Sequence, residues 1–140
     1  MQSLRAFTMI ELIMVVVVIG MVAMFAIPNY TKSVNKTYVR TGKNNLMIMY
    51  SAQKIKNTGG ILYQSCGSTA ACNAALELSV IGNGIDYTCT GTGGPPVTGF
   101  YCYASRAGEF KLKNTETTAD PCCCVANACP SVSVTCASCP

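Results

Sequence analysis

The sequence contains no histidine and only six acidic residues, and charged side chains make up 11% of the chain. Histidine is the side chain used most often for general acid–base catalysis. The six carboxylates show no paired arrangement that could do this work, and the chain has neither a glycine-rich phosphate loop nor a nucleophile elbow. These absences argue against an enzyme, and we predict no catalytic residue and no cofactor.

A long uncharged run follows near the start of the chain. Leu12 to Ile27 carry no charge and come directly after Glu11. As a helix, residues 7–27 would rise about 32 Å at about 1.5 Å per residue, which matches a bilayer hydrocarbon core of about 30 Å. We therefore predict one membrane-spanning helix. A signal-peptide core and a buried helix are the alternatives.

Glu11 is an isolated acidic residue directly before this apolar run. An ionised carboxylate at bilayer depth costs a few kcal/mol, so it calls for a partner. A cation one helical turn away, on the same chain or on a neighbour, would neutralise it in the low dielectric and fix the register between neighbouring helices. The plainer alternative is a solvated Glu11 at the level of the lipid headgroups.

Gly20 and Pro28 interrupt the helical pattern of the run. Pro28 removes one backbone donor and crowds the carbonyl of Met24, which favours a kink or a local break. Gly20 lowers helix stability on the other side of the same segment. A simple bend at the membrane surface is one outcome of this pair.

The segment Arg5-Ala6-Phe7-Thr8-Met9-Ile10-Glu11, with Gly20 and Pro28 after it, resembles the start of type IV pilins and of secretion-system pseudopilins. The resemblance covers the N-terminal part of the chain only. It implies that prepilin peptidase cuts between Ala6 and Phe7, that the Phe7 amine is then methylated, and that Glu11, Gly20 and Pro28 serve filament assembly. The residue before the cut is usually glycine in that family, and here it is alanine.

The resemblance also implies a location and partners. The precursor would cross the inner membrane once and then join a helical filament in the periplasm or outside the cell, in which the segment from Gly20 to Pro28 can unwind. Its partners would be identical or related pilin subunits, the prepilin peptidase and an assembly platform. The alternatives are a secreted disulfide-rich binding domain with a signal peptide cut near Ala26, and an anchored single-pass protein that never polymerises.

We expect four parts in the chain: a leader at 1–6, a membrane or filament-core helix at 7–28, an amphipathic helix half at 29–60 and a disulfide-rich β head at 61–140. The helix is expected to run to Asn57, before the stop signal Thr58-Gly59-Gly60. Gly42 lowers helix propensity, so a bend or an unfolded turn is expected near it. The face predicted to cover a sheet comprises Tyr30, Val34, Tyr38, Ile48, Met49, Ala52 and Ile55.

A basic stripe is predicted on the opposite side of this helix half. It comprises Lys32, Lys36, Arg40, Lys43 and Lys54. Five cations without interleaved aromatic side chains do not favour nucleic acid over a solvated face, an anionic lipid contact or the carboxylates of a neighbouring subunit.

The remaining pattern predicts a small antiparallel sheet and an α+β fold. Two alternating runs, Ile85–Thr90 and Gly99–Ala104, flank a loop of strong turn formers and predict a hairpin. Glu109–Lys113 is expected to add a third strand. Ser131–Cys136 is a candidate fourth strand, and the alanine-rich stretch Thr69–Leu78 is a candidate short helix.

Ten cysteines in 140 residues indicate an exported domain that replaces missing core with disulfides. Cys89 and Cys102 are expected to face each other across the hairpin, and Cys66 and Cys72 could close a small loop. The pairing of the other six stays open. They are Cys122, Cys123, Cys124, Cys129, Cys136 and Cys139.

Metal sites were weighed for this C-terminal region. Four thiolates from Cys124 onwards have partial zinc-ligand spacing, but no histidine and no second C-x-x-C motif support them, and neighbouring thiols in an oxidising compartment form disulfides. Glu109, Glu116 and Asp120 are too scattered for a calcium site. We predict no metal.

Overall fold

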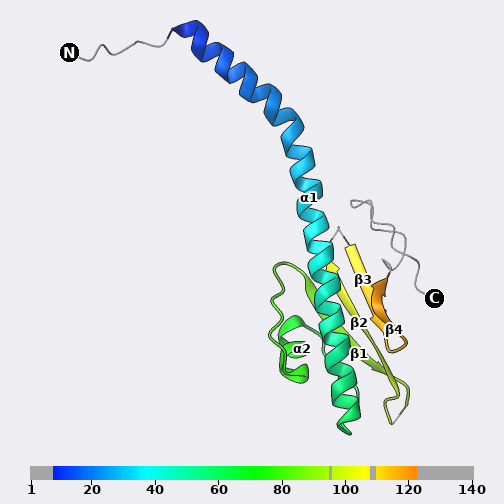
Figure 1. Cartoon of the computed structure of the whole chain (residues 1–140). Helices are drawn as coiled ribbons and strands as arrows, with labels where there is room; N and C mark the ends of the chain where they lie inside the picture. The colour runs from blue at the N-terminus through cyan, green and yellow to red at the C-terminus, as the bar shows by residue number, and fades with distance from the viewer. Residues whose placement is uncertain (1–7, 95, 108–109, 123–140) are drawn as a thin grey trace. The chain divides into compact units, whose positions relative to one another are not determined.

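The computed structural model describes residues 8–94, 96–107 and 110–122. Within these residues two helices precede four strands, and Figure 1 shows their arrangement. They are α1 (Met9–Thr58), α2 (Thr69–Leu76), β1 (Asp86–Thr92), β2 (Gly99–Arg106), β3 (Phe110–Thr115) and β4 (Thr118–Cys122). The strands form one antiparallel sheet in the order β1-β2-β3-β4. This arrangement confirms the predicted α+β class. A division between Val34 and Asn35 separates two compact units.

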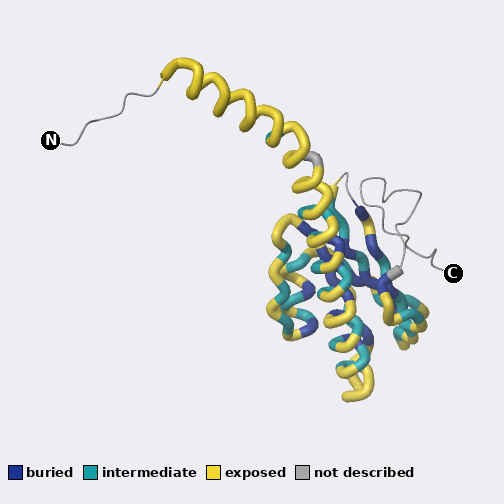
Figure 2. The backbone as a smooth tube through the Cα atoms, turned by 45° about the horizontal axis from the view of Figure 1, so that its top comes forward, coloured by how far each residue is buried: buried dark blue, intermediate teal, exposed yellow. Residues whose placement is uncertain are grey.

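In the second unit, the latter half of α1 packs on the sheet (Figure 1). Val39, Leu46 and Met49 are buried there and belong to the core formed with the strands. Their spacing of seven and three residues places them on one helical face. Figure 2 shows the contrast along α1, whose first half is exposed and whose second half carries buried positions.

This buried face differs from the predicted one, which was wrong in part. Met49 is buried as expected, but the side chains of Ile48 and Ile55 remain 47% and 70% exposed and Tyr30 is 73% exposed. The face that meets the sheet instead includes the polar side chain of Gln53, which is fully buried. Tyr38 and Ala52 pack against the core as expected. Apolarity alone misplaced part of the interface, because exposed apolar residues are common on protein surfaces.

Gly42 explains another departure from expectation. The helix runs through Gly42 without an unfolded turn. A Cβ atom added to Gly42 would lie 3.2 Å from Cδ1 of Leu112 and 3.3 Å from Cε2 of Phe110. The missing side chain therefore lets α1 approach β3 closely, and packing outweighs the low helix propensity of glycine.

Buried polar side chains tie α1 to the segments around it. Gln53 Nε2 donates to the carbonyl oxygen of Gln64 at 2.7 Å, and the backbone N–H of Gln64 donates to Gln53 Oε1 at 2.9 Å. Asn114 Nδ2, on β3, donates to the carbonyl oxygen of Leu46 at 2.8 Å. Buried amide groups need such partners, so these bonds fix how the helix sits on the sheet.

The strands largely follow the predicted pattern. The predicted hairpin is present as β1 and β2, and α2 lies inside the predicted short helix. The third strand begins at Phe110 and runs to Thr115, two residues beyond its predicted end. The candidate strand at 131–136 lies outside the described residues.

Strand β4 was not predicted. Its sequence, Thr-Ala-Asp-Pro-Cys, contains two residues that are depleted in strands. It lies at the edge of the sheet. Pro121 has no backbone N–H to donate, and an edge strand tolerates this because one of its sides has no neighbouring strand.

Candidate functional site

The first unit presents an apolar helical surface with one carboxylate. From Leu12 to Ile27 the large apolar side chains are exposed, with exposed fractions between 48% and 73%. An 18-residue window of α1 is long and apolar enough to cross a membrane, judged by length and composition. Within Met9–Val34, Glu11 is the one acidic residue that the structure describes.

Glu11 takes part in a capping box at the start of α1. The backbone N–H and the hydroxyl of Thr8 donate to Glu11 Oε2 at 3.0 and 2.9 Å, and the Glu11 N–H donates to the Thr8 hydroxyl oxygen at 3.3 Å. Reciprocal bonds of this kind satisfy donors that a helix start leaves unpaired. Our sequence reasoning missed this role, although a threonine three residues before a glutamate, ahead of an apolar run, is its known signature.

The structure keeps α1 helical through Gly20 and Pro28. Apart from the neighbouring residues and the backbone of the helix itself, no described atom lies within 4 Å of a Cβ built on Gly20. Just after Pro28, the Asn29 side chain donates to the carbonyl oxygen of Phe25 at 3.2 Å, and the Thr31 hydroxyl donates to that of Ile27 at 3.1 Å. Such side-chain bonds to a carbonyl four residues back slightly weaken a helix. Pro28 therefore lies in a locally weak part of α1, and Ala6 and Phe7 lie outside the described residues.

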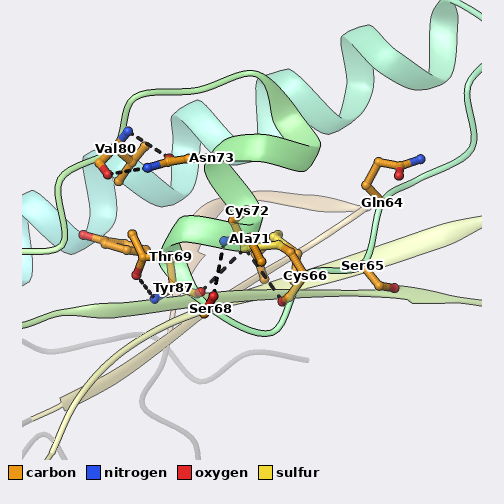
Figure 3. Close-up of a disulfide and its surroundings, with 12 residues drawn as sticks. Gln64, Ser65, Cys66, Ser68, Thr69, Ala71, Cys72, Asn73, Val80 and Tyr87 are labelled. Atoms are coloured by element: carbon orange, nitrogen blue, oxygen red, sulfur yellow. Dashed lines mark hydrogen bonds between the residues drawn. A yellow bond between two sulfur atoms is a disulfide. The ribbon is translucent and has the colours of Figure 1, made fainter.

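Among the described residues two disulfides stabilise the head, and both join the pairs expected from the sequence. Cys66 bonds to Cys72 across a separation of six residues (Figure 3), and Cys89 bonds to Cys102 between the paired strands β1 and β2. The Cys122 side chain and residues 123–140, which hold the other predicted cysteines, lie outside the described part.

These two bridges lie side by side in the core. Cys66 and Cys89 exchange backbone hydrogen bonds of 2.8 and 2.9 Å in an isolated antiparallel bridge. The sulfurs of Cys66, Cys72 and Cys89 lie within 4.8 Å of one another and all three residues are buried. Each sulfur is already bonded in a disulfide, so the cluster offers no thiolate, which is the form that binds a metal.

The predicted basic stripe is only partly free. Lys54 forms an ion pair with Glu116, and its ammonium lies 5.7 Å from the Tyr50 ring centroid. The hydrogen bond to Glu116 raises the pKa of Lys54 above its ordinary value. Lys36 and Arg40 are exposed. Lys54 therefore belongs to the helix–sheet interface, and the stripe is shorter than predicted.

A second ion pair links the end of α1 to the segment after α2. Lys56 Nζ lies 2.7 Å from Glu77 Oε1. This contact lowers the pKa of Glu77 below its ordinary value. Glu77 is exposed, so the pair contributes little to stability.

Comparison with known proteins gives one finding. Over 50 residues the chain is 46% identical to the type IV major pilin protein PilA of Myxococcus xanthus (strain DK1622). The matched segment is 36% of this chain and 23% of that relative. No family model and no solved structure matches the chain. The resemblance to type IV pilins is thus confirmed over a short segment, alongside a long N-terminal apolar helix.

Proposed function

We propose that this chain is a structural, non-enzymatic subunit of a type IV pilus or a related secretion pseudopilus, and that its apolar helices form the core of a helical filament. The observation that carries this proposal is the uncovered apolar surface of α1 from Leu12 to Ile27, joined to a folded head. The similarity to a major pilin supports it.

The apolar surface of this helix is stable only when another apolar surface shields it from water. A bilayer supplies one while the precursor sits in the inner membrane, and helices of neighbouring subunits supply another after assembly. At about 25 cal/mol per Å² of apolar surface removed from water, both settings are favourable relative to exposure. Contacts between copies that do not close into a ring produce an open helical filament. The heads would then cover the outside of the filament.

Processing would supply the missing partner of Glu11. Cleavage between Ala6 and Phe7 by prepilin peptidase creates an amine on Phe7, which is then methylated and stays cationic. This cation would pair with Glu11, on its own chain or on a neighbour's, in a low dielectric. The pair serves register more than net stability, because a subunit shifted along the axis would leave both charges unpaired.

The pairing role of Glu11 can be separated from its capping role by one substitution. Glu11→Gln keeps the capping box, since glutamine can accept the same bonds from Thr8, but it removes the charge. The Phe7 amine would then be a buried charge without a partner, which costs about 3–5 kcal/mol. We expect normal amounts of Glu11→Gln protein in the membrane and at least a tenfold loss from sheared filaments. Immunoblots of membrane and filament fractions measure both quantities.

Thr8→Val is the matched control, because it removes the hydroxyl of the capping box and leaves the charge of Glu11. We expect this variant to assemble at near-normal levels. Normal filaments from Glu11→Gln would contradict the pairing role. Normal membrane levels together with no filaments from any variant, including the unchanged chain, would point to an anchored protein that does not polymerise.

A further inference from the structure

The side of the sheet that faces away from α1 carries two tyrosines and two lysines in adjacent rows. Side chains alternate between the two faces of a strand. Phe100, Cys102 and Ala104 of β2 are buried in the core, so Tyr101 and Tyr103 lie on the outer face. On β3 the same alternation places Lys111 and Lys113 on that face. We call Tyr101, Tyr103, Lys111 and Lys113 the tyrosine–lysine platform.

The four side chains of the platform contact one another. The Tyr101 and Tyr103 ring centroids are 5.3 Å apart in an edge-to-face arrangement. Lys111 Nζ lies 4.4 Å from the centroid of Tyr103, and Lys113 Nζ lies 5.4 Å from that of Tyr101. A cation within about 6 Å of a ring centroid is attracted to the ring. Each lysine charge is therefore held beside an aromatic ring.

The described surroundings of the platform consist of hydroxyl groups and two carboxylates. β1 adds hydroxyl groups, with Thr88 opposite Tyr103 and Thr90 opposite Tyr101. Asp86 begins β1, two strand spacings or about 9.6 Å from β3, and Asp120 lies on the edge strand β4. Within the described residues, no ion pair joins either carboxylate to a platform lysine. Glu109, two residues before Lys111, lies outside the described residues. Among the residues that the structure describes, a phosphate approaching the centre of the sheet would meet cations that form no ion pair.

We propose that the tyrosine–lysine platform binds single-stranded nucleic acid. Bases would stack on the rings of Tyr101 and Tyr103, while phosphates pair with the ammonium groups of Lys111 and Lys113. Rings on a sheet combined with nearby cations are the means by which proteins hold unpaired strands. The basic stripe on α1 lacks aromatic side chains, and the platform has both groups on one surface.

This chemistry favours single strands over duplexes. A duplex hides its base faces inside the stack, so it could use the two lysines but not the tyrosine rings. Two phosphate contacts correspond to a slope of about −1.4 in log affinity against log salt for single strands, at about −0.7 per phosphate. The proposal does not depend on filament assembly, because all four residues belong to one folded unit.

The test uses the full chain in a nonionic detergent and a fluorescently labelled oligothymidylate as the probe. Fluorescence anisotropy is recorded across a salt series. Tyr103→Ala is expected to weaken binding by about 5- to 150-fold, the effect of losing one stacked base, with the salt slope unchanged. Lys113→Gln is expected to reduce the slope by about 0.7.

Two control variants accompany these measurements. Tyr103→Phe keeps the ring and is expected to bind as the unchanged chain does. Arg40→Gln removes an exposed charge from the helix stripe and is expected to change neither affinity nor slope. Near-ultraviolet circular dichroism checks that each variant retains the folded head.

Three results would overturn the proposal. The first is no binding of the oligonucleotide, and the second is equal binding by the folded Tyr103→Ala variant. The third is a loss of selectivity. It would appear as equal affinity for a duplex, or as displacement of the oligonucleotide by a sulfated polysaccharide or by phosphatidylglycerol vesicles to the same extent with and without the Tyr101 and Tyr103 rings. That last result would assign the surface to general polyanion attraction. Ring-dependent, strand-selective binding with the predicted slope would support the proposal.

Discussion

Gln53 provides a direct test of how the helix is fixed to the head. Its side chain is fully buried, and it makes two hydrogen bonds, of 2.7 and 2.9 Å, with the backbone of Gln64. Gln53→Met keeps the length of the side chain but removes both bonding groups. The N–H and C=O of Gln64 would then lack partners, at a cost of about 1–3 kcal/mol each. We expect the free energy of unfolding to fall by about 2–6 kcal/mol.

Urea unfolding of the full chain in a nonionic detergent measures this change, followed by the near-ultraviolet circular dichroism of the tyrosines. The midpoint should fall while the dependence on urea concentration stays constant, because the area exposed on unfolding is unchanged. The matched control is Asn44→Met at an exposed helix position, which should change stability by less than about 0.5 kcal/mol. A similarly small effect of Gln53→Met would refute the reasoning.

Two further predictions concern the head. Replacing both Cys89 and Cys102 by serine opens a bridge between residues 13 apart, which should lower the free energy of unfolding by about 3 kcal/mol; unchanged melting would contradict this. Burial raises the pKa of the Tyr87 phenol, and a hydrogen bond from Asn45 offsets part of this. As pH rises, the phenol proton of Tyr87 is therefore released from the unfolded chain before it is released from the folded chain. The stabilisation that this group provides is complete below about pH 10 and should be lost as pH rises through the pKa of Tyr87 in the folded chain. Tyr87→Phe should make that alkaline loss less steep, and an identical pH profile would contradict the prediction.

The sequence predicted the elements that depend on local chemistry. The hairpin follows from two alternating runs around a loop of turn formers, and it brings Cys89 opposite Cys102. The end of α1 follows from Gly59 and Gly60, which allow the chain to leave the helix. These signals lie within a few residues of the structure that they determine.

Features that depend on distant contacts were not predictable in the same way. The helix face chosen for its apolar residues contained Ile48, which is exposed, and omitted Gln53, which is buried. The buried face of α1 is decided by the hydrogen bonds to the backbone of Gln64 and by the close approach of β3 to Gly42. Neither can be recognised before the tertiary structure is known.

The candidate sites show the same division. The isolated position of Glu11 before an apolar run is visible in the sequence, and so was the signature of its capping box, which we did not use. The tyrosine–lysine platform was not visible, because Tyr103 and Lys111 become neighbours only through the pairing of β2 with β3.

The central claim is that this chain is a processed filament subunit, and the mass and N-terminal sequence of the mature protein from its native host test it most directly. We expect a chain that begins at Phe7 and is heavier by one methyl group. A chain that begins at Ile27 would indicate a secreted domain released by a signal peptidase. An intact Met1 would indicate a membrane anchor that prepilin peptidase does not cut, and either result would contradict the account.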